Sequence, residues 1–66
     1  MKKIIISEKI KSFRKEHRLT QEEFGGIMGV SAQAVSKWEK ELCYPDITFL
    51  PDLAAALGCG INDFFA

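Results

Sequence analysis

The stretch TQEEFGGIMGVSAQAVSKWE, residues 20–39, decides the fold of this chain. It opens with Thr20 and Glu23, a T-x-x-E capping box in which each side chain accepts a hydrogen bond from the backbone N–H of the other residue. Gly29 stands where a helix can end in a left-handed residue, and Ser31 is suited to cap a second helix. Two short helices joined so tightly predict a helix-turn-helix, in which the second helix is presented to DNA.

The first helix of this pair carries an apolar stripe. Phe24, Ile27 and Met28 follow one another at positions i, i+3 and i+4, which is the spacing of one helix face. Leu19, directly before the cap, is placed to pack on Phe24 one turn later. We therefore expect these apolar side chains to face the core.

The second helix, predicted over residues 32–41, separates its side chains by direction. At about 100° per residue, Val35, Trp38 and Leu42 fall near one meridian and are expected to point inward. The opposite side carries amides, hydroxyls and lysines without a carboxylate: Gln33, Ser36, Lys37 and Lys40. Such groups suit base edges and phosphates, although any solvated helix face is polar. The position directly after the glycine turn favours the DNA-binding interpretation.

Several runs of this sequence match a known pattern in register: Leu19–Glu23, Gly29–Ser31, Gln33, Val35–Glu39 and Tyr44–Asp46. Through them, residues 8–65 resemble the phage-repressor or Xre-type helix-turn-helix family. The resemblance implies an all-α, compact five-helix lambda-repressor-like domain with the helix-turn-helix at helices 2 and 3. It also implies sequence-specific binding of operator DNA, generally as a symmetric dimer, and hence a transcriptional regulator, most simply a repressor.

The DNA-binding hypothesis gives each outward side chain a role. Gln33 can pair bidentately with N6 and N7 of adenine, and Ala32 can contact a thymine methyl group. Gln21, at the start of its helix, can hold a phosphate together with the free N–H groups of that helix end. The full predicted DNA-binding set is Gln21, Ser31, Ala32, Gln33, Ser36, Lys37 and Lys40.

The resemblance implies a structural role for two charged residues. It pairs Arg14 of the first helix with Glu39, so that the first helix is tied to the recognition helix. The first helix itself is predicted to follow Ser7 as N-cap and to run to about residue 17. In the motif, Gly25 lies where the family keeps a small residue for close helix approach, whereas Gly26 has no such explanation.

The segment after the recognition helix departs from the family. Lys40-Glu41-Leu42 replaces a common Asn-Gly-Lys, so a glycine stop is missing and the helix is expected to run on to Leu42. Further along, Thr48 is predicted to cap a helix that holds Pro51 in its first turn, where the missing N–H costs nothing. That helix is expected to end at Gly58.

The C-terminal end suggests a partner. Phe64 and Phe65 are not easily buried together in so small a core, and the family commonly dimerises here, so a homodimer through Ile61, Phe64 and Phe65 is predicted. Two alternatives stay open: both rings cap the core of a monomer, or the chain is the N-terminal part of a longer regulator that pairs elsewhere.

Composition is that of one small domain. The chain has 66 residues, 47% of them hydrophobic, and zero formal net charge. Residues 1–66 are predicted to form one domain, with 1–6 as a flexible or extended N-terminal tail. All nine basic residues lie in 1–40 beside five acidic ones, whereas 41–66 has four acidic residues and no basic one. This polarity permits a positive face on a neutral protein.

The same sequence excludes several classes of function. It shows no nucleophile–base pair, phosphate loop or metal-ligand cluster, so no enzyme, cofactor, metal or small-molecule substrate is predicted. Cys43 and Cys59 lie far apart and are expected to be reduced thiols. Three isoleucines near the N-terminus fall short of an apolar signal region, which favours a cytoplasmic protein and no membrane.

One class of function competes with DNA binding. Zero net charge and the apolar residues Ile27, Leu42 and Phe65 favour a protein-interaction module on the same fold, such as an antitoxin or anti-repressor.

Overall fold

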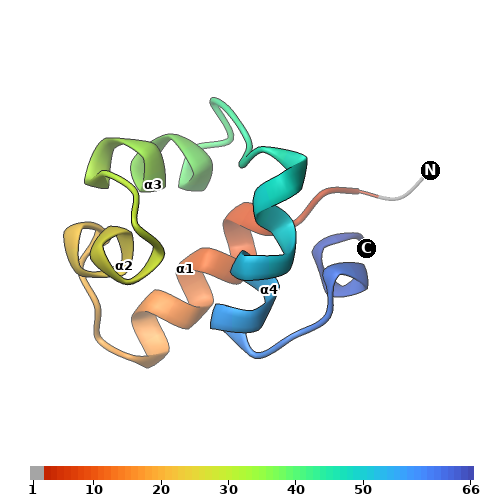
Figure 1. Cartoon of the computed structure of the whole chain (residues 1–66), viewed down its shortest axis with the longest axis horizontal. Coiled ribbons are helices and arrows are strands. Elements are labelled where there is room, and N and C mark those ends of the chain that lie inside the picture. The colour runs from red at the N-terminus through yellow and green to blue at the C-terminus, as the bar shows by residue number, and fades with distance from the viewer. Residues whose placement is uncertain (1–2) are drawn as a thin grey trace.

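The computed structural model describes residues 3–66, which fold as helices joined by short loops (Figure 1). Within these residues there are four α-helices and two 3₁₀ segments, in the order α1 Ile6–Glu16, α2 Gln21–Met28, α3 Ala32–Glu39, η1 Ile47–Phe49, α4 Leu50–Leu57 and η2 Ile61–Phe64. The prediction of an all-α domain with a helix-turn-helix at its second and third helices is confirmed. The fifth helix is the 3₁₀ segment η2.

Every α-helix contributes to one core. In Figure 1, α1 crosses the middle of the molecule, with α2 and α3 to one side of it and α4 to the other. The fully enclosed side chains are Phe24, Phe64, Ile10, Leu53 and Val35, and they are joined by Ile6, Trp38, Leu50 and Ala54. The core therefore lies directly behind α3, whose Val35 and Trp38 enter it as predicted.

Left-handed residues end all four α-helices. Gly29 and Gly58 have φ of 76° and 71°, as their positions in the sequence predicted, whereas Arg18 and Glu41 adopt φ of 54° and 61° without being glycine. Non-glycine residues visit this region at a cost of about 1–2 kcal/mol. The chain accepts this cost twice, at the end of α1 and at the end of α3.

The prediction that α3 runs on to Leu42 is wrong. The helix ends at Glu39, and the Glu41 N–H donates to Trp38 O at 3.2 Å while the Leu42 N–H donates to Lys37 O at 2.9 Å. These two bonds form a Schellman motif with glutamate in the position that usually holds glycine. Leu42 therefore leaves the helical meridian and is 71% exposed.

The N-terminal segment also differs from its prediction. Residues 1–2 lie outside the described part, but Ile4 forms an antiparallel bridge with Phe65, and the Ile5 N–H donates to Phe64 O at 2.8 Å. Ile6 is already helical and buried, so a tail over residues 1–6 is wrong at that end. Ser7 is not the N-cap; it lies inside α1 and is buried. Residues 3–5 therefore lie beside residues 64–66, and Lys3 and Ala66 exchange two backbone hydrogen bonds of 2.7 and 2.8 Å.

The start of α4 lies one residue later than predicted. Thr48 belongs to η1, and its hydroxyl donates to the Asp46 carboxylate instead of capping a helix. The helix begins at Leu50, which places Pro51 in the first turn, where its lack of an N–H is tolerated.

The C-terminal aromatic residues do not share one environment. Phe64 is fully enclosed in the core, so it cannot contact a second chain as predicted, and Phe65 is half-buried. Ile61 remains exposed. Within residues 3–66, no helix combines the length and the apolar character needed to cross a membrane.

One apolar residue of α2 that was predicted to face the core is exposed instead. Phe24 is buried and Met28 packs on the core as predicted, but Ile27 is 60% exposed. Next to it, the two glycines differ: a Cβ at Gly25 would lie 2.6 Å from the Val30 carbonyl oxygen, whereas a Cβ at Gly26 would meet nothing within 4 Å. The absence of a side chain at Gly25 allows the Val30 backbone to lie close to α2, whereas no neighbouring atom requires a glycine at position 26.

This difference gives a matched pair of variants. Gly26→Ala should raise the free energy of unfolding by about 0.5–1 kcal/mol, because alanine loses less conformational freedom in a helix. Gly25→Ala should lower it, because the new methyl group collides with Val30 backbone. Urea unfolding of both variants checks this, and a change of the same sign in both would contradict the assignment.

Candidate DNA-binding site

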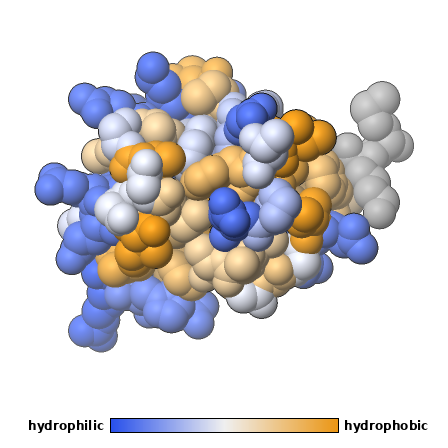
Figure 2. Space-filling model, in the orientation of Figure 1, coloured by the Kyte–Doolittle hydropathy of each residue, from blue (hydrophilic) through white to orange (hydrophobic). Residues whose placement is uncertain are grey.

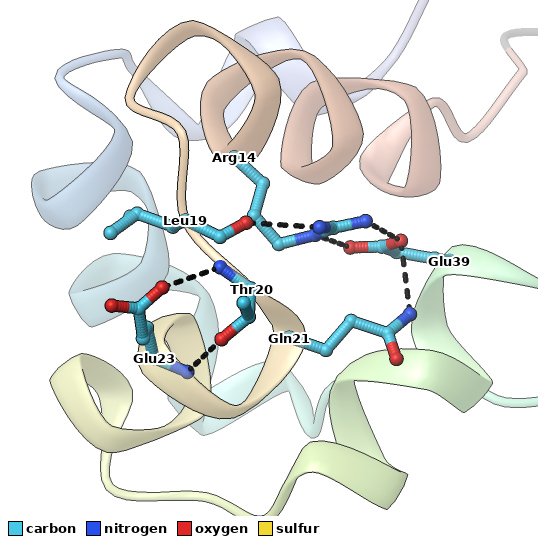
Figure 3. A network of polar contacts seen from close by, with 6 residues as sticks. All are labelled: Arg14, Leu19, Thr20, Gln21, Glu23 and Glu39. Atoms are coloured by element: carbon cyan, nitrogen blue, oxygen red, sulfur yellow. Dashed lines mark hydrogen bonds and ion pairs between the residues drawn. The ribbon is translucent and has the colours of Figure 1, made fainter.

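The turn between α2 and α3 is held by local hydrogen bonds. At the start of α2, the Glu23 N–H donates to Thr20 Oγ1 at 3.0 Å and the Thr20 N–H donates to Glu23 Oε1 at 2.9 Å (Figure 3). At the turn, the Val30 N–H donates to Gly25 O at 2.8 Å, and the Ala34 N–H donates to the Ser31 hydroxyl at 3.1 Å. The capping box and the serine cap are confirmed; the first fixes where α2 begins and the second where α3 begins.

The side chains of α3 divide as the helical period requires. Val35 is fully buried and Trp38 stacks at a tilt on Phe49, with 5.7 Å between ring centroids. On the opposite side, Gln33, Lys37 and Lys40 are exposed, and Ala32 and Ser36 are half-buried. Ser31 is exposed, although its hydroxyl oxygen already caps the helix.

The only acidic residue between positions 32 and 40 is turned away from this outer side. Glu39 is 8% exposed, and its two carboxylate oxygens accept bonds from Arg14 Nε at 2.7 Å and Nη2 at 2.9 Å. The ion pair implied by the family resemblance is therefore present, in bidentate form. It leaves the outer side of α3 with amide, hydroxyl and ammonium groups only.

Arg14 also holds the connection between α1 and α2. Its Nη1 donates to Leu19 O at 3.0 Å, just before the capping box (Figure 3). Burial opposes ionisation of Glu39, but hydrogen bonds from Arg14 and Gln21 outweigh it and hold the pKa of this carboxyl below its usual value. The bond to Glu39 in turn raises the pKa of Arg14. Both groups are charged in the folded protein.

Gln21 takes part in this network, which the sequence did not indicate. Its Nε2 donates to Glu39 Oε1 at 3.3 Å, across 18 residues of sequence. The side chain predicted to hold a phosphate is thus anchored beside α3, with its backbone in the first turn of α2, where helix N–H groups have no partner within the helix. No periodic or capping signal marks such a long-range contact.

The predicted binding residues all lie in α2, in α3 or at the two ends of α3. In Figure 2, hydrophilic side chains line the margin where Figure 1 places α2 and α3. A separate hollow of about 200 Å³ lies between α1 and the end of α4, lined by Lys9, Ser12, Phe13, Glu16, His17, Leu57 and Cys59. None of the predicted DNA-binding residues contributes to that hollow. Burial, and then the nearby Asp63, raises the pKa of the Cys59 thiol.

A capped and tight turn that presents a polar second helix defines the helix-turn-helix class of proteins. Residues 10–64 match the helix-turn-helix family HTH_3, and the chain belongs to this family. Among solved structures, it is similar to the P22 c2 repressor in complex with a synthetic operator, with 31% identity, a TM-score of 0.80 and 94% of each chain covered. No curated protein matches the sequence significantly.

The buried carboxylate of Glu39 should make the free energy of unfolding depend on pH. Because the pKa of Glu39 is lowered from 4.5, its contribution is complete above that value and is lost as pH falls through the folded-state pKa. Wild type should therefore lose more unfolding free energy than Glu39→Gln between about pH 6 and pH 3. Urea unfolding at both pH values measures this, with the exposed Glu16→Gln as control. An equal acid loss in wild type and Glu39→Gln would contradict it.

Proposed function

We propose that this chain binds duplex DNA sequence-specifically by inserting α3 into the major groove, and that it regulates transcription, as a repressor. One observation carries the proposal: α3 presents a polar, basic outer side without a carboxylate, because Glu39 is drawn inward by Arg14. The similar P22 c2 repressor was solved with an operator. We further propose that residues 1–66 form one domain, that the protein is cytoplasmic and that it is not an enzyme.

Base reading falls to the N-terminal half of α3. Gln33 is exposed in the first turn, and its amide matches the acceptor N7 and donor N6 of adenine. Ala32 lies beside it with a methyl group that suits the methyl of thymine. Ser36 and Lys37 follow about one turn further along the same side and reach bases or phosphates.

Phosphate contacts surround this reading surface. Lys37 and Lys40 are exposed and carry charge toward the duplex backbone. Gln21 and Ser31 begin the two helices of the motif, where unpaired N–H groups and the positive helix end favour a phosphate oxygen. Because the net charge is zero, sequence-independent affinity should be modest, and it should fall as the salt concentration rises.

Dimerisation completes the proposal. Ile61 is exposed and Phe65 is half-buried at the end of the chain, and an apolar contact between two copies there would be isologous. Phe64 serves the core instead. A symmetric pair would require two half-sites about 34 Å apart, or a multiple of that distance.

A second function is favoured by one specific observation. Leu42, in the loop after α3, and Ile47, the first residue of η1, are 71% and 76% exposed, and Tyr44 between them in the sequence is also exposed. Every charged residue from Glu41 onward is acidic. An apolar, acidic surface of this kind suits a protein partner, as in an antitoxin or anti-repressor, and not a nucleic acid.

A test on random duplex separates the two functions. At low salt, the fluorescence anisotropy of a labelled random duplex should rise on titration with the protein, and the rise should disappear as salt increases. Absence of binding at low salt would leave the interaction function as the one supported. Selection from a random duplex pool then gives the target sequence and the half-site spacing.

Substitutions should distinguish residues that contact bases from residues that contact phosphates. Gln33→Ala should cost about 1–3 kcal/mol on the selected target and relax preference at one base pair. Lys37→Ala should weaken binding to all sequences alike and reduce the slope of log K against log salt by about one. Anisotropy titrations on selected and random duplexes measure both. An equal loss on both duplexes for Gln33→Ala would remove its reading role.

A further inference from the structure

Glu41 joins the end of α3 to the beginning of α1. The Ser7 hydroxyl donates to Glu41 Oε1 at 3.0 Å across 34 residues of sequence. Ser7 is 2% exposed, so its hydroxyl has little access to water. Ile5, the N-cap residue of α1, provides no side-chain cap. Glu41 therefore brings a negative charge to the first turn of a helix that lacks a local cap, where the helix dipole favours an anion.

The backbone of Glu41 adopts a conformation that would suit glycine better. Glu41 has φ of 61°, a conformation that L residues rarely adopt. Its N–H and that of Leu42 complete the Schellman motif that ends α3. Glycine would meet the backbone requirement at lower cost, but it has no side chain with which to reach Ser7. The residue at 41 thus performs two tasks, to end α3 and to hold α1.

Two carboxylates consequently attach α3 to α1 at separate points. Glu39 binds Arg14, and Glu41 binds Ser7. Residues 7 and 14 lie two turns apart on α1, about 10 Å along its axis at about 1.5 Å per residue. In addition to the burial of Val35 and Trp38 in the core, two polar attachments separated along α1 constrain the angle between the two helices more than one attachment would.

We infer that Ser7 and Glu41 are positioning residues that set the angle at which α3 is presented to DNA. The inference rests on the proposed DNA binding. Base contacts need a side-chain amide within hydrogen-bond reach of a base edge, whereas lysines on long flexible stems still reach phosphates after a small rotation. Loss of the Ser7–Glu41 bond therefore lowers the preference for the target over random duplex while random binding persists.

The charge of Glu41 must be separated from its contact, because the residue follows Lys40, a proposed phosphate contact. Three variants achieve this. Glu41→Gln removes the charge and keeps an oxygen that can accept from Ser7. Glu41→Ala removes both, and Ser7→Ala removes the contact but keeps the charge.

Affinities for the selected target and for random duplex are measured by anisotropy for wild type and each variant. Glu41→Gln and Glu41→Ala should gain random-duplex affinity equally, because they lose the same charge. Only Glu41→Ala and Ser7→Ala should lose target preference, by about fivefold, the lower end of what one base contact contributes. Urea unfolding confirms that each variant is folded; should Ser7→Ala not fold, the two Glu41 variants alone decide.

Residual dipolar couplings of the α1 and α3 amides in the free protein give a readout that does not depend on DNA. A changed interhelical angle in Ser7→Ala and Glu41→Ala, but not in Glu41→Gln, shows that the Ser7–Glu41 contact sets the angle of α3. If wild type nevertheless binds no duplex, the proposed function fails, and with it the consequence of that angle for DNA, while the positioning role of the two residues stands. Wild-type angle and target preference in both Ser7→Ala and Glu41→Ala would overturn it.

Discussion

The pairing of Arg14 with Glu39 connects every part of the candidate site. A carboxylate 8% exposed is costly unless it is paired and hydrogen-bonded, and Arg14 meets this need in bidentate form. The same guanidinium holds Leu19 O before α2, and the same carboxylate accepts from Gln21. Side chains from α1 and α2 therefore both bind the Glu39 carboxylate of α3. Glu39 lies one turn after Val35 on the inner side of α3, so the interaction that joins the helices also neutralises this carboxylate away from the outer side.

The features that the sequence predicted correctly are those whose partners lie within one or two turns. The Thr20 capping box, the Ser31 cap and the glycine stops at Gly29 and Gly58 each depend on bonds across three to five residues, so residue types at fixed spacing suffice to reveal them. The family resemblance added the Arg14–Glu39 pair, which spans 25 residues. With Val35 and Trp38 on the inner side, these features define the motif and its outer surface.

The errors share a different physical origin. Helical periodicity assigns directions only as far as a helix continues, so Leu42 was assigned to the core because nothing in the sequence revealed that Glu41 would adopt a left-handed conformation. Ser7 has the chemistry of an N-cap, but its hydroxyl bonds to a carboxylate 34 residues away. Gly25 and Gly26 look alike in the sequence, and only the neighbouring Val30 carbonyl distinguishes them. Tertiary contacts decided each of these cases.

The dimensions of α3 bear on how the protein could be selective. Eight residues extend about 12 Å at about 1.5 Å per residue, which matches three to four base pairs at about 3.4 Å each. If base reading rests mainly on Gln33, as we propose, that contact contributes about 1–3 kcal/mol in each copy. That is far below the roughly 4–10 kcal/mol that separates specific from non-specific binding. Two copies on one duplex would add their contacts, and the zero net charge supplies little sequence-independent affinity, so the shortness of this helix supports the dimer that we propose.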